Sequence, residues 1–361
     1  MPVQTPPLDG PEVIVPTPAH ATDSRAREMD RPWERVRLHV VTGKGGTGKT
    51  TIACALALAL AAQGRRVLLA EVEGRQGISQ TLDVPPLPAT ETPIFKVSGG
   101  GEVYGLAVDA KTALIEYLDI FYHLGRAGRA LEKVGAIDFA TTIAPGVRDI
   151  LLIGKVYEAC RRRGPKPRAD GSPDWFYDSV VLDAPPTGRI GRFLAVNREI
   201  ADLAKMGPIR HQADSITDLL RSPACAVHIV TLPEEMPVQE AVDAVAELSA
   251  DDLPVGAIIV NQSRDPLLDP EQLDVLAQGE ADRAAVAASL RRTGLPDDDA
   301  TVTGLLAEGA DHALRMQLED EQYTVVEQLG RPVYALPSLR DGVDASGVRV
   351  LAAELADRAT W

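Results

Sequence analysis

The chain has 361 residues and a formal net charge of −15 at pH 7, from 37 Lys and Arg against 52 Asp and Glu. Its composition, 45% hydrophobic and 25% charged, is typical of a globular protein. An acidic surface repels nucleic acid and anionic lipid, so we expect no nucleic-acid partner. The longest apolar run, around Ile52–Ala62, is about half the length of a spanning helix, and no secretory signal is visible. A cytoplasmic protein is therefore expected.

Residues 1–35 are rich in proline and show no apolar periodicity. Proline blocks helix formation, and so little apolar surface cannot offset the entropy lost on ordering. The sequence predicts a disordered N-terminal tail here, with a docking segment for a partner as the alternative.

From Val36 onward, short apolar runs alternate with longer segments that can be helical. This alternation predicts an α/β fold with a doubly wound, mostly parallel sheet. Residues 36–361 are expected to form a single domain, with helical insertions at about 111–163 and 269–328 and a last helix packed against the domain. The predicted strands are Val36–Thr42, Arg66–Glu71, Val103–Val108, Ser179–Leu182, Ala226–Thr231, Val255–Val260 and Val333–Leu336.

A glycine-rich loop follows the first predicted strand, and a helical run, Ile52–Gln63, comes after it. Glycines let backbone N–H groups converge on phosphate oxygens, and a helix N-terminus favours negative charge. We expect the loop to bind ATP, with Lys49 against the β- and γ-phosphates and the Thr50 hydroxyl on Mg²⁺. Its residues, Gly43-Lys44-Gly45-Gly46-Thr47-Gly48-Lys49-Thr50-Thr51, match the P-loop pattern G-x-x-x-x-G-K-[ST].

Lys44 directly follows the first glycine of this loop, where phosphate binding within one chain requires no lysine. The loop resembles the deviant Walker A class of P-loops, in which this lysine contacts the nucleotide bound to a partner subunit. The resemblance implies a dimer in which Lys44 supplies charge in trans. A solvated surface lysine is the alternative.

A second motif directly follows the predicted strand Ser179–Leu182. Asp183 at the carboxyl end of this strand is well placed to hold Mg²⁺, directly or through water. The alternative is an aspartate that caps the following turn. The motif reads Asp183-Ala184-Pro185-Pro186-Thr187-Gly188-Arg189.

The two motifs together resemble the arsenite-pump and guided-entry (GET) ATPase family, whose loop reads T-G-K-G-G-x-G-K-T and whose second switch reads D-T-A-P-T-G-H. The resemblance covers about residues 36–340 and implies a Mg²⁺-dependent ATPase. It implies an adenine contact for Asn261, an adenine-facing loop at Pro337 and a switch role for residues 186–189, where Arg189 replaces the histidine. Supporting matches are Pro145–Asp149, Pro233-Glu234 and Val260-Asn261-Gln262.

The first switch departs from the family pattern. The family has an aspartate there that orients the attacking water, and the alignment places Glu73 at this position. Glu73 keeps the carboxylate but adds a methylene. A displacement of about 1 Å can lower a rate about a hundredfold, so slow turnover is expected. Glu71 is the competing candidate.

Three cysteines lie on different predicted elements and form no C-x-x-C pair. The sequence therefore predicts no structural zinc, no metalloid site and no iron–sulfur cluster. Cys54 and Cys225 are expected in the core, and Cys160 on the surface.

These observations predict an ATPase that acts as a dimeric switch, either a homodimer or a heterodimer with a paralogous chain. Its client is an unidentified protein or membrane protein. The predicted helical face with Leu114, Leu118, Phe121 and Tyr122 belongs either to a client groove or to the core. Three alternatives stay open: a nucleotide-binding scaffold without turnover, a metalloid efflux subunit, and a partition- or septum-type ATPase. The cysteine placement argues against the second, and the absence of a basic face argues against the third.

Overall fold

The structure is a computed structural model that describes residues 12–13, 33, 36–72, 74, 76–122, 145–164, 174–195, 208–339 and 342–358. At its centre lies a sheet whose nine described strands follow the order β1-β4-β5-β3-β6-β2-β7-β8-β9. Neighbouring strands are parallel throughout, except that β4 and β5 are antiparallel. The predicted doubly wound, mostly parallel α/β fold is confirmed.

All seven predicted strands are present. The prediction missed β4 (Thr92–Val97), which forms a hairpin with β5 through a glycine turn. Pro93 near the start of β4 gives this segment a broken strand pattern. The others are β2 (Leu38–Gly43), β3 (Arg66–Glu71), β5 (Glu102–Ala107), β6 (Ser179–Asp183), β7 (Cys225–Thr231), β8 (Val255–Ser263) and β9 (Val333–Pro337).

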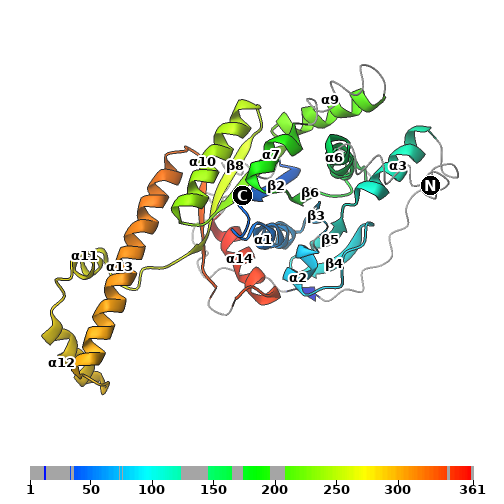
Figure 1. Cartoon of the computed structure of the whole chain (residues 1–361). Helices are drawn as coiled ribbons and strands as arrows, with labels where there is room; N and C mark the ends of the chain where they lie inside the picture. The colour runs from blue at the N-terminus through cyan, green and yellow to red at the C-terminus, as the bar shows by residue number, and fades with distance from the viewer. Residues whose placement is uncertain are drawn as a thin grey trace, which may run out of the picture.

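Helices cover both faces of the sheet (Figure 1). One face packs against α6 (Pro145–Arg161), α7 (Thr187–Leu194), α9 (Pro208–Arg221) and α10 (Glu235–Ala250). The other packs against α1 (Lys49–Ala62), α2 (Gly77–Leu82) and α14 (Ala345–Arg358). Because α1 lies between the sheet and α14, it is apolar on all sides, which is the pattern of a fully buried helix.

The two long segments without strand pattern are helical where they are described. The first contains α3 (Ala110–Tyr122) and α6, and residues 123–144 lie outside the described part of the chain. The second contains α11 (Pro270–Ala277), α12 (Arg283–Thr293) and α13 (Asp299–Glu327), which extend away from the sheet (Figure 1). Each of these three helices begins after an aspartate whose carboxylate accepts hydrogen bonds from backbone N–H groups of its first turn.

Two parts of the predicted N-terminal tail belong to the folded structure. Glu12–Val13 forms β1, which pairs with Lys96 and Val97 of β4. Trp33 is only 3% exposed. The expectation of a disordered tail is therefore wrong for these three residues. A free sheet edge offers unpaired backbone groups, with which the backbone of β1 pairs. The indole ring of Trp33 gains free energy by burial. These two effects order the three residues despite the surrounding prolines.

The prediction of an exposed Cys160 is also wrong, since Cys54, Cys160 and Cys225 are all buried. Cys160 lies on the sheet-facing side of α6, and burial raises the pKa of its thiol to about 12. The arginines that follow Cys160 suggested a surface position. They lie at and beyond the C-terminal end of α6, after the apolar residues that pack against the sheet. None of the described helices combines the length and hydropathy required to cross a membrane.

Candidate nucleotide-binding site

The glycine-rich loop lies at the carboxyl edge of the sheet, between β2 and α1. β2 is a central strand, flanked by β6 and β7. The chain continues first to β3 on one side of β2 and later to β7 on the other. In open α/β sheets, ligands bind at the carboxyl ends of the strands where the strand order reverses in this way.

Three glycines of the loop, Gly43, Gly46 and Gly48, are required by its geometry, and Gly46 has a φ of 93°. A Cβ added at Gly43 would lie 2.8 Å from Oγ1 of Thr47 and would overlap the carbonyl oxygen of Val230. Gly48 has a φ of 87°, in the left-handed region, and serves as the N-cap of α1. A Cβ at Gly45 or Gly46 would meet nothing within 4 Å, so the backbone there borders open space.

Hydrogen bonds hold the loop in shape from within and from β8. The backbone N–H and the hydroxyl of Thr47 both donate to the Lys44 carbonyl, at 3.3 and 2.9 Å. Asn261, 4% exposed, donates from Nδ2 to the Thr47 carbonyl at 2.9 Å. The resemblance implied an adenine contact for Asn261, and in this structure its amide supports the loop. Sequence reasoning did not foresee this contact.

The N-terminus of α1 faces the loop. The helix begins at Lys49, and no side chain caps its first turn, because the N-cap is a glycine. Uncapped N–H groups and the helix dipole favour an anion at this position. Lys49 and Thr50 are half-buried and Thr51 is buried. A phosphate group bound here would therefore meet backbone donors and the Lys49 ammonium.

The fold brings the predicted magnesium residues together. The Thr50 hydroxyl donates to Oδ2 of Asp183 at 2.7 Å. Asp183 ends β6, pairs in register with Val41 of β2, and is 8% exposed. A hydroxyl and a carboxylate beside a phosphate site are oxygen donors of the kind that Mg²⁺ prefers. The donor set therefore fits the implied ion.

Glu71 has a structural task that the sequence did not reveal. It lies opposite Asp183 in the register of β3 and β6 and is 3% exposed. Its two carboxylate oxygens accept hydrogen bonds from the backbone N–H groups of Gln76, at 2.9 Å, and Ile78, at 3.2 Å. Glu71 therefore holds the start of α2, the segment aligned with the first switch. Glu73 lies outside the described residues.

The second switch is tied to β2. The Thr42 hydroxyl donates to the Pro185 carbonyl at 2.7 Å. After Pro186, α7 starts at Thr187, which is buried, whereas Gly188 and Arg189 are exposed. The segment that follows Asp183 thus connects the strand edge to a helix on the outer layer.

Lys44 makes an ion pair within its own chain. Its Nζ lies 2.9 Å from Oε1 of Glu240 on α10, and both side chains are partly exposed. The hydroxyl of Thr187 donates to the other carboxylate oxygen, Oε2, at 3.3 Å. No motif in the sequence indicated Glu240.

Pro337 ends β9, at the same edge of the sheet. It pairs in register with Ser263 of β8, and the N–H of Ser338 donates to the Ser263 carbonyl at 2.8 Å. The loop after β9 therefore starts beside the strand that carries Asn261.

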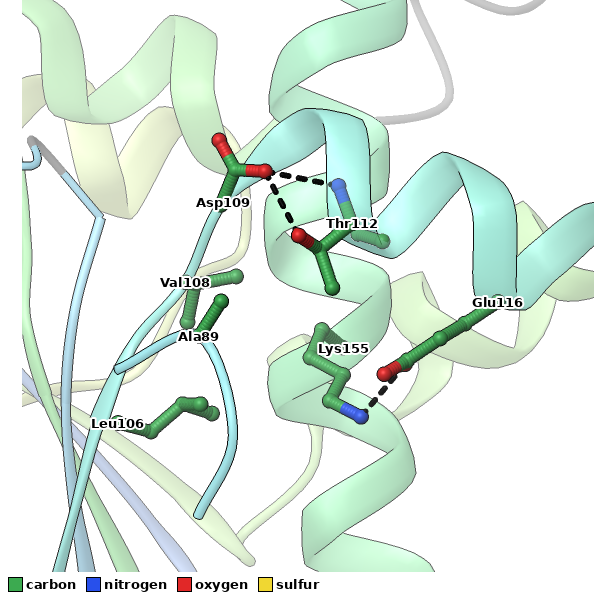
Figure 2. Close-up of a pocket in the computed structure, with 8 residues that line it drawn as sticks. Ala89, Leu106, Val108, Asp109, Thr112, Glu116 and Lys155 are labelled. Atoms are coloured by element: carbon green, nitrogen blue, oxygen red, sulfur yellow. Dashed lines mark hydrogen bonds and ion pairs between the residues drawn. The ribbon is translucent and has the colours of Figure 1, made fainter. Parts of the chain in front are cut away.

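A shallow pocket lies where β5 meets α3 and α6, and Figure 2 shows its lining. Leu106 and Val108 form its apolar side, and Lys155 of α6 reaches Glu116 of α3 at 2.6 Å. No residue of the glycine-rich loop lines it. The side chains of Leu118, Phe121 and Tyr122 are outside the described part, so the proposed client groove is not tested.

The sheet topology and the loop together define the class of protein, a P-loop nucleoside triphosphatase. A family model described as anion-transporting ATPase matches residues 36–214. ATPase BagA of Mycobacterium tuberculosis is 49% identical over 323 residues, which cover 90% of this chain and 93% of the relative. The chain belongs to this family, the anion-transporting ATPases of the arsenite-pump and GET type.

More distant relatives carry the two names that the sequence motifs suggested. ATPase GET3 of Kluyveromyces lactis is 25% identical over 256 residues, covering 62% of this chain and 70% of the relative. The arsenical pump-driving ATPase of Escherichia coli is 28% identical over 267 residues, covering 69% of this chain and 40% of the relative. The resemblance to the arsenite-pump and GET family is thus confirmed.

Proposed function

We propose that this chain binds and hydrolyses ATP in a Mg²⁺-dependent reaction and acts as a dimeric switch. The observation that carries the proposal is the hydrogen bond between Thr50 and Asp183 directly beside the glycine-rich loop. This contact puts a hydroxyl and a buried carboxylate, two oxygen donors of the kind that Mg²⁺ prefers, at one position beside the loop.

Each chemical role falls to a residue of the loop or the strand ends. Lys49 and the loop N–H groups would bind the β- and γ-phosphates, and Thr50 and Asp183 would hold Mg²⁺, with Asp183 acting through a water molecule. Bound Mg²⁺ would offset the negative charge that the phosphates carry. Glu73 would orient the attacking water, while Asn261 and Pro337 would border the adenine.

We infer the dimer from the position of Lys44 in the loop. A lysine that reaches the nucleotide of a second subunit supplies positive charge in trans, as an arginine finger does. ATP would therefore draw two subunits together, and hydrolysis would release them. The second subunit is either a copy of this chain or a paralogous ATPase, and the cycle would drive the binding and release of a protein or membrane-protein client.

The main alternative is a scaffold that binds nucleotide without turnover. The replacement of the first-switch aspartate by Glu73 favours it, because the added methylene moves the carboxylate. An ATPase assay with and without a paralogous chain separates the two functions.

The first experiment is light scattering with and without Mg²⁺ and a non-hydrolysable ATP analogue. A shift from the 38.5 kDa of one chain to twice that mass supports the homodimer switch. A monomer at every nucleotide concentration contradicts the homodimer, and adding the paralogous chain from the same host then tests the heterodimer.

A further inference from the structure

Glu240 connects two elements that respond to nucleotide in the proposed function. One carboxylate oxygen pairs with Lys44 of the loop at 2.9 Å, and the other accepts a hydrogen bond from Thr187 at 3.3 Å. Thr187 is the first residue of α7 and belongs to the second-switch segment, residues 186–189. A single side chain on α10 therefore contacts both the loop lysine and the switch helix.

Helices α7 and α10 pack against each other on the same face of the sheet. A Cβ added at Gly191 of α7 would lie 2.6 Å from Cδ of Glu247, about two turns beyond Glu240 on α10. The exposed side chain of Glu247 therefore lies directly against the backbone of α7 at Gly191.

The Lys44 ammonium has one positive charge, which cannot be fully neutralised by Glu240 and at the same time serve the nucleotide of another subunit. The ion pair is partly exposed, with side-chain exposures of 29% for Lys44 and 38% for Glu240. Partly exposed pairs are weak and exchange easily. A weak ion pair that competes with a second partner for the same ammonium group suits a contact that forms in one state and breaks in another.

We infer that Glu240 is a positioning residue that holds Lys44 and Thr187 together in the nucleotide-free subunit and releases Lys44 when the dimer forms. The release step rests on the proposed role of Lys44 in trans, whereas the bridge itself does not. Glu240 thereby sets the affinity of the dimer and couples the loop to the second switch.

The bridge is tested by amide hydrogen exchange in the nucleotide-free full-length chain. Glu240→Gln removes the charge that Lys44 pairs with and weakens the acceptor for Thr187, so exchange should become about threefold faster in both residues 43–49 and 184–194, as expected for a weak pair. Thr187→Val should affect only 184–194.

Asp243→Asn is the matched control, because Asp243 is an exposed carboxylate on the same helix that accepts a hydrogen bond from Gln239. Unchanged exchange in either region of Glu240→Gln overturns the bridge.

The release step is tested by the dissociation constant of the dimer with Mg²⁺ and a non-hydrolysable ATP analogue. Glu240→Gln should tighten the dimer about threefold and leave the affinity of one subunit for ATP within about twofold, whereas Asp243→Asn should change neither. A dimer that is equally tight or weaker overturns the release step. If the wild-type chain binds ATP but forms no dimer with itself or a paralogue, the proposed switch fails and the release step with it, while hydrogen exchange still decides the bridge.

Discussion

The Thr50 hydroxyl donates a hydrogen bond to the Asp183 carboxylate at 2.7 Å, across 133 positions of sequence. This contact joins the helix after the phosphate loop to the end of the neighbouring strand. It places two oxygen donors of the kind that Mg²⁺ prefers directly beside the glycine-rich loop.

Asp183→Asn should keep the hydrogen bond from Thr50, because an amide oxygen still accepts, but it removes the negative charge. We expect Mg²⁺-dependent ATP binding to weaken ~10- to 100-fold, as for the loss of a charged hydrogen-bond partner. Calorimetric titration with and without Mg²⁺ measures this. Asp178→Asn, at the opposite end of the same strand, is the control, since Asp178 accepts a hydrogen bond from the N–H of Arg66 far from the loop. An unchanged Mg²⁺ dependence in Asp183→Asn would contradict the metal assignment.

Lys49→Ala should abolish tight nucleotide binding, because in the proposed function Lys49 is the cation that binds the phosphates. We expect the dissociation constant for ATP to rise about 100-fold or more, measured with a fluorescent ATP analogue. Lys96→Ala, which changes an exposed lysine on the edge strand β4, should bind ATP normally. Equal affinities of the two variants would exclude the loop as the nucleotide site.

Glu73→Gln and Glu71→Gln should separate catalysis from structure. In the proposed function Glu73 orients the attacking water, so Glu73→Gln should lower ATP turnover ~100-fold and leave the free energy of unfolding within about 0.5 kcal/mol. Glu71→Gln should destabilise the fold by about 1–3 kcal/mol, since an amide cannot accept both N–H groups that the buried carboxylate accepts. Denaturant unfolding and an ATPase assay measure both quantities. Turnover that survives Glu73→Gln but not Glu71→Gln, with stability unchanged, would show that Glu71 orients the water.

His39 and His228 predict a loss of stability in mild acid. The two buried rings stack between β2 and β7, with Nδ1 of His39 3.1 Å from Nε2 of His228, and Trp33 covers them. Burial and the neighbouring ring hold the pKa of His39 well below 6.5, and burial lowers the pKa of His228 to about 3.

Both histidines are therefore neutral in the folded chain at pH values at which the unfolded chain is protonated. Their contribution to stability is complete above pH 6.5 and falls as the pH drops from 6.5 towards 3. Between pH 7.5 and 5.5 we expect the pair to cost about 3 kcal/mol of unfolding free energy. His39→Leu/His228→Leu should lack this part of the pH dependence, and urea unfolding at the two pH values measures it. A pH dependence that is the same in both proteins would disprove the role of the pair.

The three thiols should be unreactive in the native protein. Cys54, Cys160 and Cys225 are all buried, and burial raises the pKa of each thiol, so little thiolate is present at pH 8. Ellman's reagent should label less than one thiol in the native chain and three after denaturation. Rapid labelling of Cys160 in the native chain would show that α6 turns its sheet-facing side outward.

The sequence predicted the buried strands well because parallel strands covered on both faces are continuous apolar runs. β4 escaped prediction because Pro93 interrupts its pattern and because it lies towards the sheet edge, where fewer residues are buried. β1 and Trp33 escaped for a different reason. β1 is ordered by pairing with a free strand edge, and Trp33 by packing against His228. Neither the strand edge nor His228 lies within residues 1–35, so the local sequence does not predict these contacts.

The phosphate loop could be read from the sequence alone, since its chemistry resides in nine adjacent residues whose backbone conformation is set by glycines and by the helix that follows. The order of the strands was set by tertiary packing, and with it every contact that crosses the sheet. Asn261 reaches Thr47 across 214 positions, Glu71 turns its carboxylate to the start of α2, and Glu240 pairs with Lys44. Hydrophobic periodicity specifies which face of an element is buried, but it carries no information about which element lies next to it. For this reason, the residues that hold and couple the loop became visible only in the folded chain.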